Sequence, residues 1–210
     1  MIGKNNIIYR THKKIKEAIS ARKKVFIWKL KGRPIPPPHA VKQKIVKSYA
    51  LKFSLQNFIE TGTYMGEMID AVLHTFSKII SIEFGQVLAE RAKNRFSSYA
   101  HVKIIQGDSG QKLSDVMSNI NEPCLFWLDA HYSGGVTTQN DRETPIVKEL
   151  SVLLEHPCPN HVILIDDARE FTGQNNYPLL DEVRNLIAAK HPDWIMQVKD
   201  DVIRIHKAVF

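Results

Sequence analysis

The sequence has few cysteines and no long apolar run. Only Cys124 and Cys158 occur among 210 residues, which excludes a disulfide framework and favours a reduced, cytoplasmic protein. No apolar stretch approaches the ~20 residues that a membrane-spanning helix needs. The charged N-terminal stretch is not followed by the apolar region of a signal peptide. The sequence therefore predicts a cytoplasmic protein with no spanning segment.

Acidic residues are almost absent from the beginning of the chain. Residues 1–50 contain 14 lysines and arginines and a single acid, Glu17, whereas residues 51–210 contain 15 basic and 21 acidic residues. This asymmetry predicts a basic arm, residues 1–53, joined to a slightly acidic domain, residues 54–210. A strongly basic arm indicates an anionic partner.

The arm divides into a helix, a proline-rich spacer and a second helix. Thr11–Lys31 predicts a basic amphipathic helix with Ile15, Ile19, Phe26 and Leu30 on one face, although residues 25–30 alone would also suit a short strand. Residues 32–39, "GRPIPPPH", exclude a helix because proline lacks the backbone donor. A further helix is expected over residues 41–53. The arm is interpreted as a lid over an acceptor site, a clamp for an anionic acceptor or membrane surface, or a solvated packing helix.

From residue 57 onwards, predicted strands and helices alternate. Strands are expected at 57–62, 78–83, 101–108, 124–130 and 161–167, and helices at 66–76, 86–96, 111–119, 145–155 and 178–190. Residues 193–210 predict an antiparallel hairpin that turns at Lys199-Asp200. This order predicts an α/β, doubly wound, mostly parallel sheet with helices on both faces.

Each of the five predicted parallel strands ends in a carboxylate. These are Glu60, Glu83, Asp108, Asp129 and the pair Asp166-Asp167. Because parallel strands end at one edge of a sheet, these groups are expected to converge on the crevice where such sheets bind ligands. Converging carboxylates indicate a site that holds a cationic or hydroxyl-rich ligand.

The first turn favours an adenosine-type cofactor. Gly62 and Gly66 allow a ligand close to the backbone, and Glu83 lies about 20 residues on, where an acid binds a ribose diol. Glu60 would repel a pyrophosphate but would hold a cationic amino-acid group. The pattern therefore favours S-adenosylmethionine over a nicotinamide dinucleotide.

Four motifs carry a family resemblance. "FIETGTYMGEMIDA", "SIEFG", "IIQGDSG" and "FWLDAHYSGG" resemble the successive motifs of class I S-adenosylmethionine-dependent methyltransferases, from Phe58 to the C-terminus. The resemblance implies a Rossmann-like seven-stranded sheet whose last two strands are the hairpin. It places Glu83 on the ribose. The other implied cofactor-binding residues are Glu60, Thr61, Gly62, Thr63, Tyr64, Gly66, Gly107, Asp108, Ser109 and Asp129.

A second resemblance concerns Asp129, Asp166 and Asp167. Three carboxylates on neighbouring strands suit Mg²⁺, as in the metal-dependent O-methyltransferases of the catechol and macrocin (antibiotic-sugar) types, which this chain resembles. His131 stands where the sugar enzymes often have a second acid. It is the candidate catalytic base, with Asp129 as the other catalytic residue, and residues 132–135 are interpreted as a substrate loop.

The sequence thus predicts an O-methyltransferase, assisted by Mg²⁺, for a sugar, another polyhydroxylated small molecule or a glycan, with an anionic acceptor suiting the arm. Two alternatives are a metal-dependent hydrolase using Asp129, His131, Asp166 and Asp167, and a non-catalytic nucleotide-binding module. Asp108 would also suit a helix cap, and Arg169 would suit a partner for the Asp166-Asp167 pair.

Nucleic acid is disfavoured as a partner because no base-readout motif accompanies Phe26 and Trp28. Peripheral contact with the inner face of a membrane fits the arm, and a homo-oligomer is compatible with the sequence.

Overall fold

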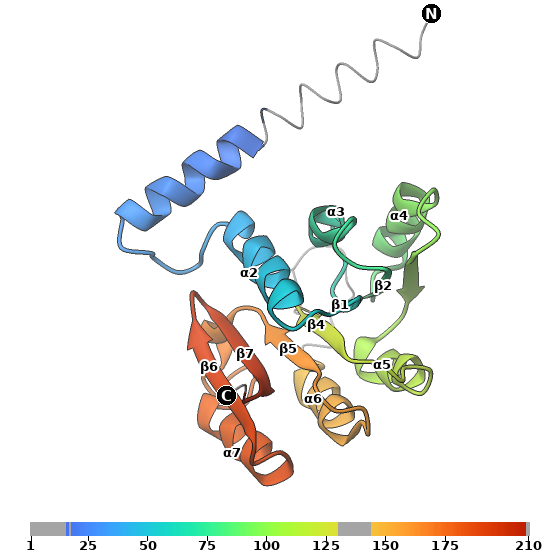
Figure 1. Cartoon of the computed structure of the whole chain (residues 1–210), viewed down its shortest axis with the longest axis vertical. Coiled ribbons are helices and arrows are strands. Elements are labelled where there is room, and N and C mark those ends of the chain that lie inside the picture. The colour runs from blue at the N-terminus through green and yellow to red at the C-terminus, as the bar shows by residue number, and fades with distance from the viewer. Residues whose placement is uncertain (1–15, 17, 130–143, 209–210) are drawn as a thin grey trace, which may run out of the picture.

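The computed structural model describes residues 16, 18–129 and 144–208. One mixed sheet lies between two layers of helices (Figure 1). The strands follow the order β3-β2-β1-β4-β5-β7-β6. Their bounds are β1 (Asn57–Thr61), β2 (Lys78–Glu83), β3 (Val102–Gln106), β4 (Cys124–Leu128), β5 (Val162–Ile165), β6 (Trp194–Lys199) and β7 (Val202–Lys207). The predicted doubly wound sheet with a C-terminal hairpin is confirmed.

The first five strands pair in parallel, and β7 is antiparallel to both β5 and β6. The hairpin turns one residue later than the sequence predicted, because β6 continues through Lys199 and the turn is formed by Asp200 and Asp201. Both turn residues have positive φ, 51° and 60°, as a two-residue hairpin turn requires.

Six labelled helices cover the two faces of the sheet, three on each side (Figure 1). One side carries α2 (His39–Lys52), α3 (Glu67–Val72) and α4 (Gln86–Phe96), and the other carries α5 (Ser109–Met117), α6 (Ile146–Glu155) and α7 (Leu180–Lys190). A short 3₁₀ helix, η1 (Ala168–Glu170), follows β5. The helix expected at 66–76 is shorter than predicted and ends at Val72.

Alternate residues of each central strand enter opposite cores. In β4, Leu125 and Trp127 pack with α2, α3 and α4, whereas Phe126 and Leu128 pack with α5, α6 and α7. This double burial explains why "CLFWL" is apolar at every position. It also explains why polarity begins at Asp129, the first residue beyond the strand.

The arm contributes two helices with different surroundings. α2 packs on α3 and β4, with Val46 fully buried. Residues 18–30 form a separate helix that extends away from the layers (Figure 1), and residues 31–38 join the two without helix. Among the described residues, no helix combines the length and apolarity needed to cross a bilayer.

Candidate active site

Strands β1, β4 and β5 are adjacent, so their C-terminal residues lie side by side. The Asp129 amide donates to the carbonyl of Thr61 at 3.1 Å, and the Asp166 amide donates to that of Leu128 at 3.0 Å. These bonds fix the backbone where the strands leave the core. The strand-end residues of three βα units are thereby brought side by side, and those of β4 and β5 line one pocket.

Glu60, the residue before the last of β1, is a buried carboxyl, 1% exposed. Its Oε1 accepts a hydrogen bond from the Ser81 hydroxyl at 2.6 Å, and the Ser81 hydroxyl also contacts that of Thr63 at 2.5 Å. Burial, with the charges of Asp129 and Glu83, raises the Glu60 pKa to about 8. A cationic ligand would reverse this shift by stabilising the carboxylate.

Glu83, at the end of β2, shapes the turn beside it. Its Oε2 accepts the Tyr64 amide at 2.8 Å, and its Oε1 accepts the Gly85 amide at 2.9 Å. Each carboxylate oxygen can accept more than one hydrogen bond. Glu83 can therefore hold the turn and still accept hydroxyl groups from a ribose.

The glycine turn requires glycine at Gly66. Its φ is +72°, and a Cβ there would lie 2.8 Å from the ring of Phe96. Gly62 also adopts a positive φ, 84°. Both predicted glycines therefore occupy left-handed backbone next to the candidate cofactor site.

Asp108 and Ser109 open α5. The Asp108 Oδ1 accepts the Gly110 amide at 2.8 Å, so the alternative role as a helix cap is observed. Gly107 before it has a φ of +146°, and Ser109 is buried. Ser109 is hydrogen-bonded to Glu149, and the predicted binding of the cofactor by Gly107, Asp108 and Ser109 stays a prediction.

The three predicted metal ligands come together. Asp129, Asp166 and Asp167 each offer an oxygen, and the three oxygens lie within 4.8 Å of one another. Burial, with the charges of Asp129 and Asp167, raises the Asp166 pKa to about 7, although Lys42 opposes the shift. The oxygen donors and their spacing fit a single Mg²⁺ ion.

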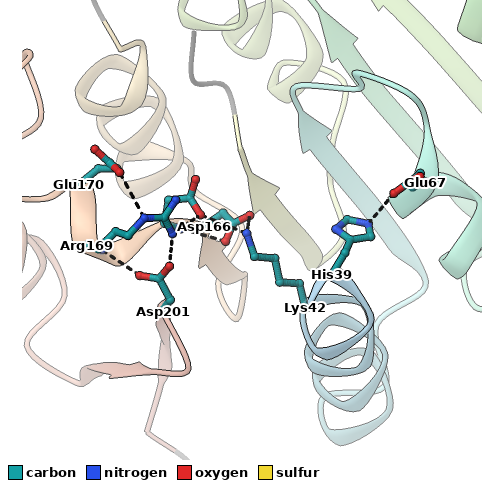
Figure 2. A network of polar contacts seen from close by, with 8 residues as sticks. His39, Lys42, Glu67, Asp166, Arg169, Glu170 and Asp201 are labelled. Atoms are coloured by element: carbon teal, nitrogen blue, oxygen red, sulfur yellow. Dashed lines mark hydrogen bonds and ion pairs between the residues drawn. The ribbon is translucent and has the colours of Figure 1, made fainter. Parts of the chain in front are cut away.

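Two side-chain cations offset part of the negative charge of this cluster. Lys42 Nζ, from α2, lies 2.5 Å from Asp166 Oδ2 (Figure 2) and 3.0 Å from Asp167 Oδ1. Burial disfavours the charged ammonium, but Asp166 and Asp167 outweigh it, so the Lys42 pKa is raised. Arg169 donates to Asp167 at 2.9 Å and pairs with Asp201, which confirms it as a partner of the Asp pair.

A pocket lies beside the cluster and is lined by Leu128, Asp129, Thr144, Ile146, Glu149, Ile165, Asp166, Asp167 and Tyr177. Glu149 is 1% exposed. Burial raises the pKa of Glu149 to about 7, although hydrogen bonds with the Ser109 and Thr61 hydroxyls act to lower it. The pocket therefore combines apolar walls with several ionisable groups.

His39 begins α2 close to the same cluster. Its Nε2 lies 3.8 Å from Glu67 Oε2 (Figure 2). Its burial lowers its pKa although Glu67 and Asp129 act in the opposite direction. A neutral imidazole is thus favoured here, as a proton acceptor requires.

His131 and the loop of residues 132–135 lie outside the described residues. Their catalytic and substrate-binding roles stay predictions.

Sequence reasoning missed four residues of the site. Lys42, His39, Glu149 and Tyr177 reach it from α2, α6 and the segment before α7. For Lys42 a signal existed, because it precedes Ile45 and Val46 by three and four residues and so shares their buried face. The other three carried no pattern that separates them from structural residues.

No protein-family model matches the sequence, and a search among curated proteins gives no significant match. Many solved structures do match. An O-methyltransferase from Bacillus cereus in complex with SAH is 14% identical, covering 89% of this chain and 90% of its own, with a TM-score of 0.57. The O-methyltransferase TomG from Streptomyces achromogenes, involved in tomaymycin synthesis and in complex with SAM, is 15% identical over 90% of this chain and 89% of its own, with a TM-score of 0.59.

The SAH-bound methyltransferase PaMTH1 from Podospora anserina is 18% identical over 81% of this chain and 79% of its own, with a TM-score of 0.55. At such identities the likeness is one of fold. The chain has the Rossmann-like fold of class I S-adenosylmethionine-dependent methyltransferases, and it resembles O-methyltransferases among them.

Proposed function

We propose that this protein is an S-adenosylmethionine-dependent O-methyltransferase of a sugar, another polyhydroxylated small molecule or a glycan. The observation that carries the proposal is the pair of buried carboxyls, Glu60 and Glu83, beside the glycine turn of a sheet with methyltransferase order. A carboxylate at Glu60 suits the ammonium of the cofactor, and Glu83 suits its ribose hydroxyls. The O-methyltransferases of similar fold that are crystallised with SAM or SAH support this cofactor.

The reaction would be a direct displacement. An acceptor oxygen attacks the sulfonium methyl, the carbon–sulfur bond breaks, and S-adenosylhomocysteine leaves while a base takes the hydroxyl proton. His131 is the base that the sequence predicts, and His39 is a second candidate because burial lowers its pKa. The Lys42 ammonium contacts two carboxylates that line the pocket and would stabilise negative charge on the acceptor oxygen.

Asp129, Asp166 and Asp167 would hold Mg²⁺, which when bound polarises acceptor hydroxyl groups. Lys42 contacts two of these three carboxylates. The ammonium and the ion would therefore compete for the same oxygens, and the chain supplies a cation of its own at this position.

The cofactor is tested by mass spectrometry of the purified protein for carried-over S-adenosylhomocysteine, and by calorimetry. We expect Glu83→Gln to weaken the binding of S-adenosylhomocysteine at least tenfold, because an amide accepts hydrogen bonds from ribose hydroxyls less strongly than a carboxylate does. Glu90→Gln, an exposed carboxyl on α4 paired with Lys93, is the matched control. Unchanged affinity in Glu83→Gln would contradict the proposal and favour the hydrolase hypothesis, which makes no use of Glu83.

A further inference from the structure

The C-terminal part of the helix of residues 18–30 packs against the protein through one side. Ala21 and Val25 are half-buried on this side, and Trp28 is only 6% exposed. The Trp28 indole donates to the carbonyl of Pro34 at 2.7 Å, and the Arg33 guanidinium lies over its ring at 5.8 Å. Trp28 also shares a buried cluster with Val41 and Ile45 of α2. The proline-rich segment and α2 thus fix the helix from one side.

The opposite side exposes large apolar side chains. Ile19 and Phe26 are each 62% exposed, and Leu30 is 71% exposed. At about 100° per residue these three positions fall within an arc of about 40°. They are aligned along one side of the helix, and we call them the apolar stripe. Such a stripe on a protein surface indicates a binding site.

Basic side chains border the apolar stripe. Arg22 and Lys29 lie on one edge of it and Lys23 on the other, at the angles that a helix of 3.6 residues per turn gives. All three are exposed, as are Lys24 and Lys31. Residues 18–53 contain no acid, so no negative charge of this part of the chain weakens the positive field.

The positive charge beside the apolar stripe discriminates among the partners that could bind it. A second copy of the chain would bring the same basic border against itself, and like charges facing each other oppose such contact. A nucleic acid would use the lysines and arginines but would leave Ile19, Phe26 and Leu30 in water. An anionic bilayer accepts both, because phosphate groups meet the border while the acyl boundary buries the stripe.

We propose that the helix of residues 18–30 docks onto an anionic phospholipid surface and lies in its interface, with the apolar stripe inserted. This surface is separate from the carboxylate crevice, so docking needs neither cofactor nor acceptor. The inference therefore stands or falls independently of the proposed methyltransferase activity.

Vesicle flotation with the full chain tests the docking. We expect the protein to float with vesicles that contain phosphatidylglycerol and not with vesicles of phosphatidylcholine alone. Phe26→Glu with Leu30→Glu should weaken binding more than tenfold, because both side chains leave the acyl boundary. Leu51→Glu, at an 84% exposed leucine on α2, is the matched control and should bind like the unaltered protein.

The basic border is tested in the same assay. Lys23→Gln and Lys29→Gln should each weaken binding about fivefold, the effect of one cation near an anionic surface. Lys103→Gln, an exposed lysine on β3, should leave binding unchanged. Circular dichroism of each variant checks that the helix content is kept.

Three results would overturn the proposal. The first is no binding of the unaltered protein to anionic vesicles. The second is full binding by the Phe26→Glu, Leu30→Glu variant, which would place the membrane contact on another surface of the protein. The third is a dimer, seen by light scattering, that this variant abolishes, because the stripe would then bind a second copy.

Discussion

Lys42 connects the beginning of the chain to the centre of the candidate site. Its ammonium is within 3.0 Å of both Asp166 and Asp167, and it is held by a helix that the cofactor motifs do not include. A single side chain of α2 therefore contributes to the charge of a cluster in which Asp166 and Asp167 lie more than a hundred positions further along the chain. Changes at this position should alter the cluster without disturbing the strands that carry it.

Replacing Lys42 should increase the affinity of the cluster for divalent cations. In Lys42→Met we expect Mg²⁺ to bind at least about tenfold more tightly, because a cation in contact with two carboxylates is worth one pKa unit or more. Isothermal titration calorimetry with Mg²⁺ measures the change. Lys44→Met, at an exposed lysine on the same helix, is the control. Equal Mg²⁺ affinity in the two variants would show that Lys42 and the ion do not compete.

Glu60 should release a proton when the cofactor binds. Its pKa is about 8 in the ligand-free protein, so the carboxyl is mostly protonated at neutral pH. An ammonium beside it favours the carboxylate. Below the Glu60 pKa, affinity for S-adenosylhomocysteine should therefore rise with pH, by up to about tenfold per unit.

Calorimetry in buffers of different ionisation enthalpy measures this proton release. Glu60→Gln should abolish the proton release that Glu60 contributes, whereas Glu90→Gln should retain it. The same release in both variants would assign the proton to another group.

At the scale of elements, the turn between β1 and α3 depends on a glycine that touches α4. Gly66→Ala forces a Cβ to 2.8 Å from Phe96 in addition to straining a φ of +72°. Gly32 has a similar φ, +78°, with no atom within 4 Å of its Cβ position. Comparing Gly66→Ala with Gly32→Ala therefore separates the cost of backbone strain from the cost of steric overlap.

We expect Gly66→Ala to lower the free energy of unfolding by about 2–4 kcal/mol and Gly32→Ala by about 1 kcal/mol. Urea denaturation followed by circular dichroism gives both values. Equal losses would mean that the Phe96 ring moves away at little cost. Cofactor affinity should also fall in Gly66→Ala alone.

His161 ties β4 to the residues before β5. Its Nδ1 accepts the Cys124 amide at 3.1 Å, and its Nε2 contacts His156 at 3.0 Å. Burial and the neighbouring His156 lower the His161 pKa to about 4. The neutral ring is therefore part of the folded structure.

Acid should destabilise the protein through His161. Because the folded pKa lies below the unfolded value of 6.5, the stabilisation is complete above pH 6.5 and is lost as the pH falls towards 4. The loss amounts to about 3 kcal/mol. His161→Gln should flatten this part of the pH profile in thermal unfolding, whereas His74→Gln, at an exposed histidine, should not.

At the scale of the whole molecule, buried carboxyls act in the opposite direction. Glu149 has a folded pKa of about 7 against an unfolded 4.5, so its stabilisation is complete below pH 4.5 and is lost as the pH rises through 7. Glu60 and Asp166 share this sign. The ligand-free protein should therefore be most stable in mildly acidic solution.

Thermal unfolding across pH measures this optimum. Glu149→Gln should flatten the alkaline side, and a saturating cofactor should move the optimum upwards by ionising Glu60. An optimum well above neutrality without ligand would contradict the buried, protonated carboxyls.

Periodicity predicted most of the molecule because it is local. The five βα units and the hairpin follow from alternating apolar segments, and the acids at strand ends converge because parallel strands end together. The site residues that the sequence did not predict depend on contacts between distant segments. Lys42 meets Asp166 across 124 residues, and Glu149 of α6 is buried beside Thr61 and Ser109, which come from other segments. No spacing within a short window records either contact.

The Lys42 contact also has a consequence for biosynthesis. α2 leaves the ribosome early, whereas Asp166 and Asp167 follow only after five of the strands. At about 5–20 residues per second, the ammonium waits roughly 6–25 seconds for its carboxylates. During that interval nearly every charge on the nascent chain's first fifty residues is positive. The contact that completes the crevice can therefore form only when most of the domain has been made.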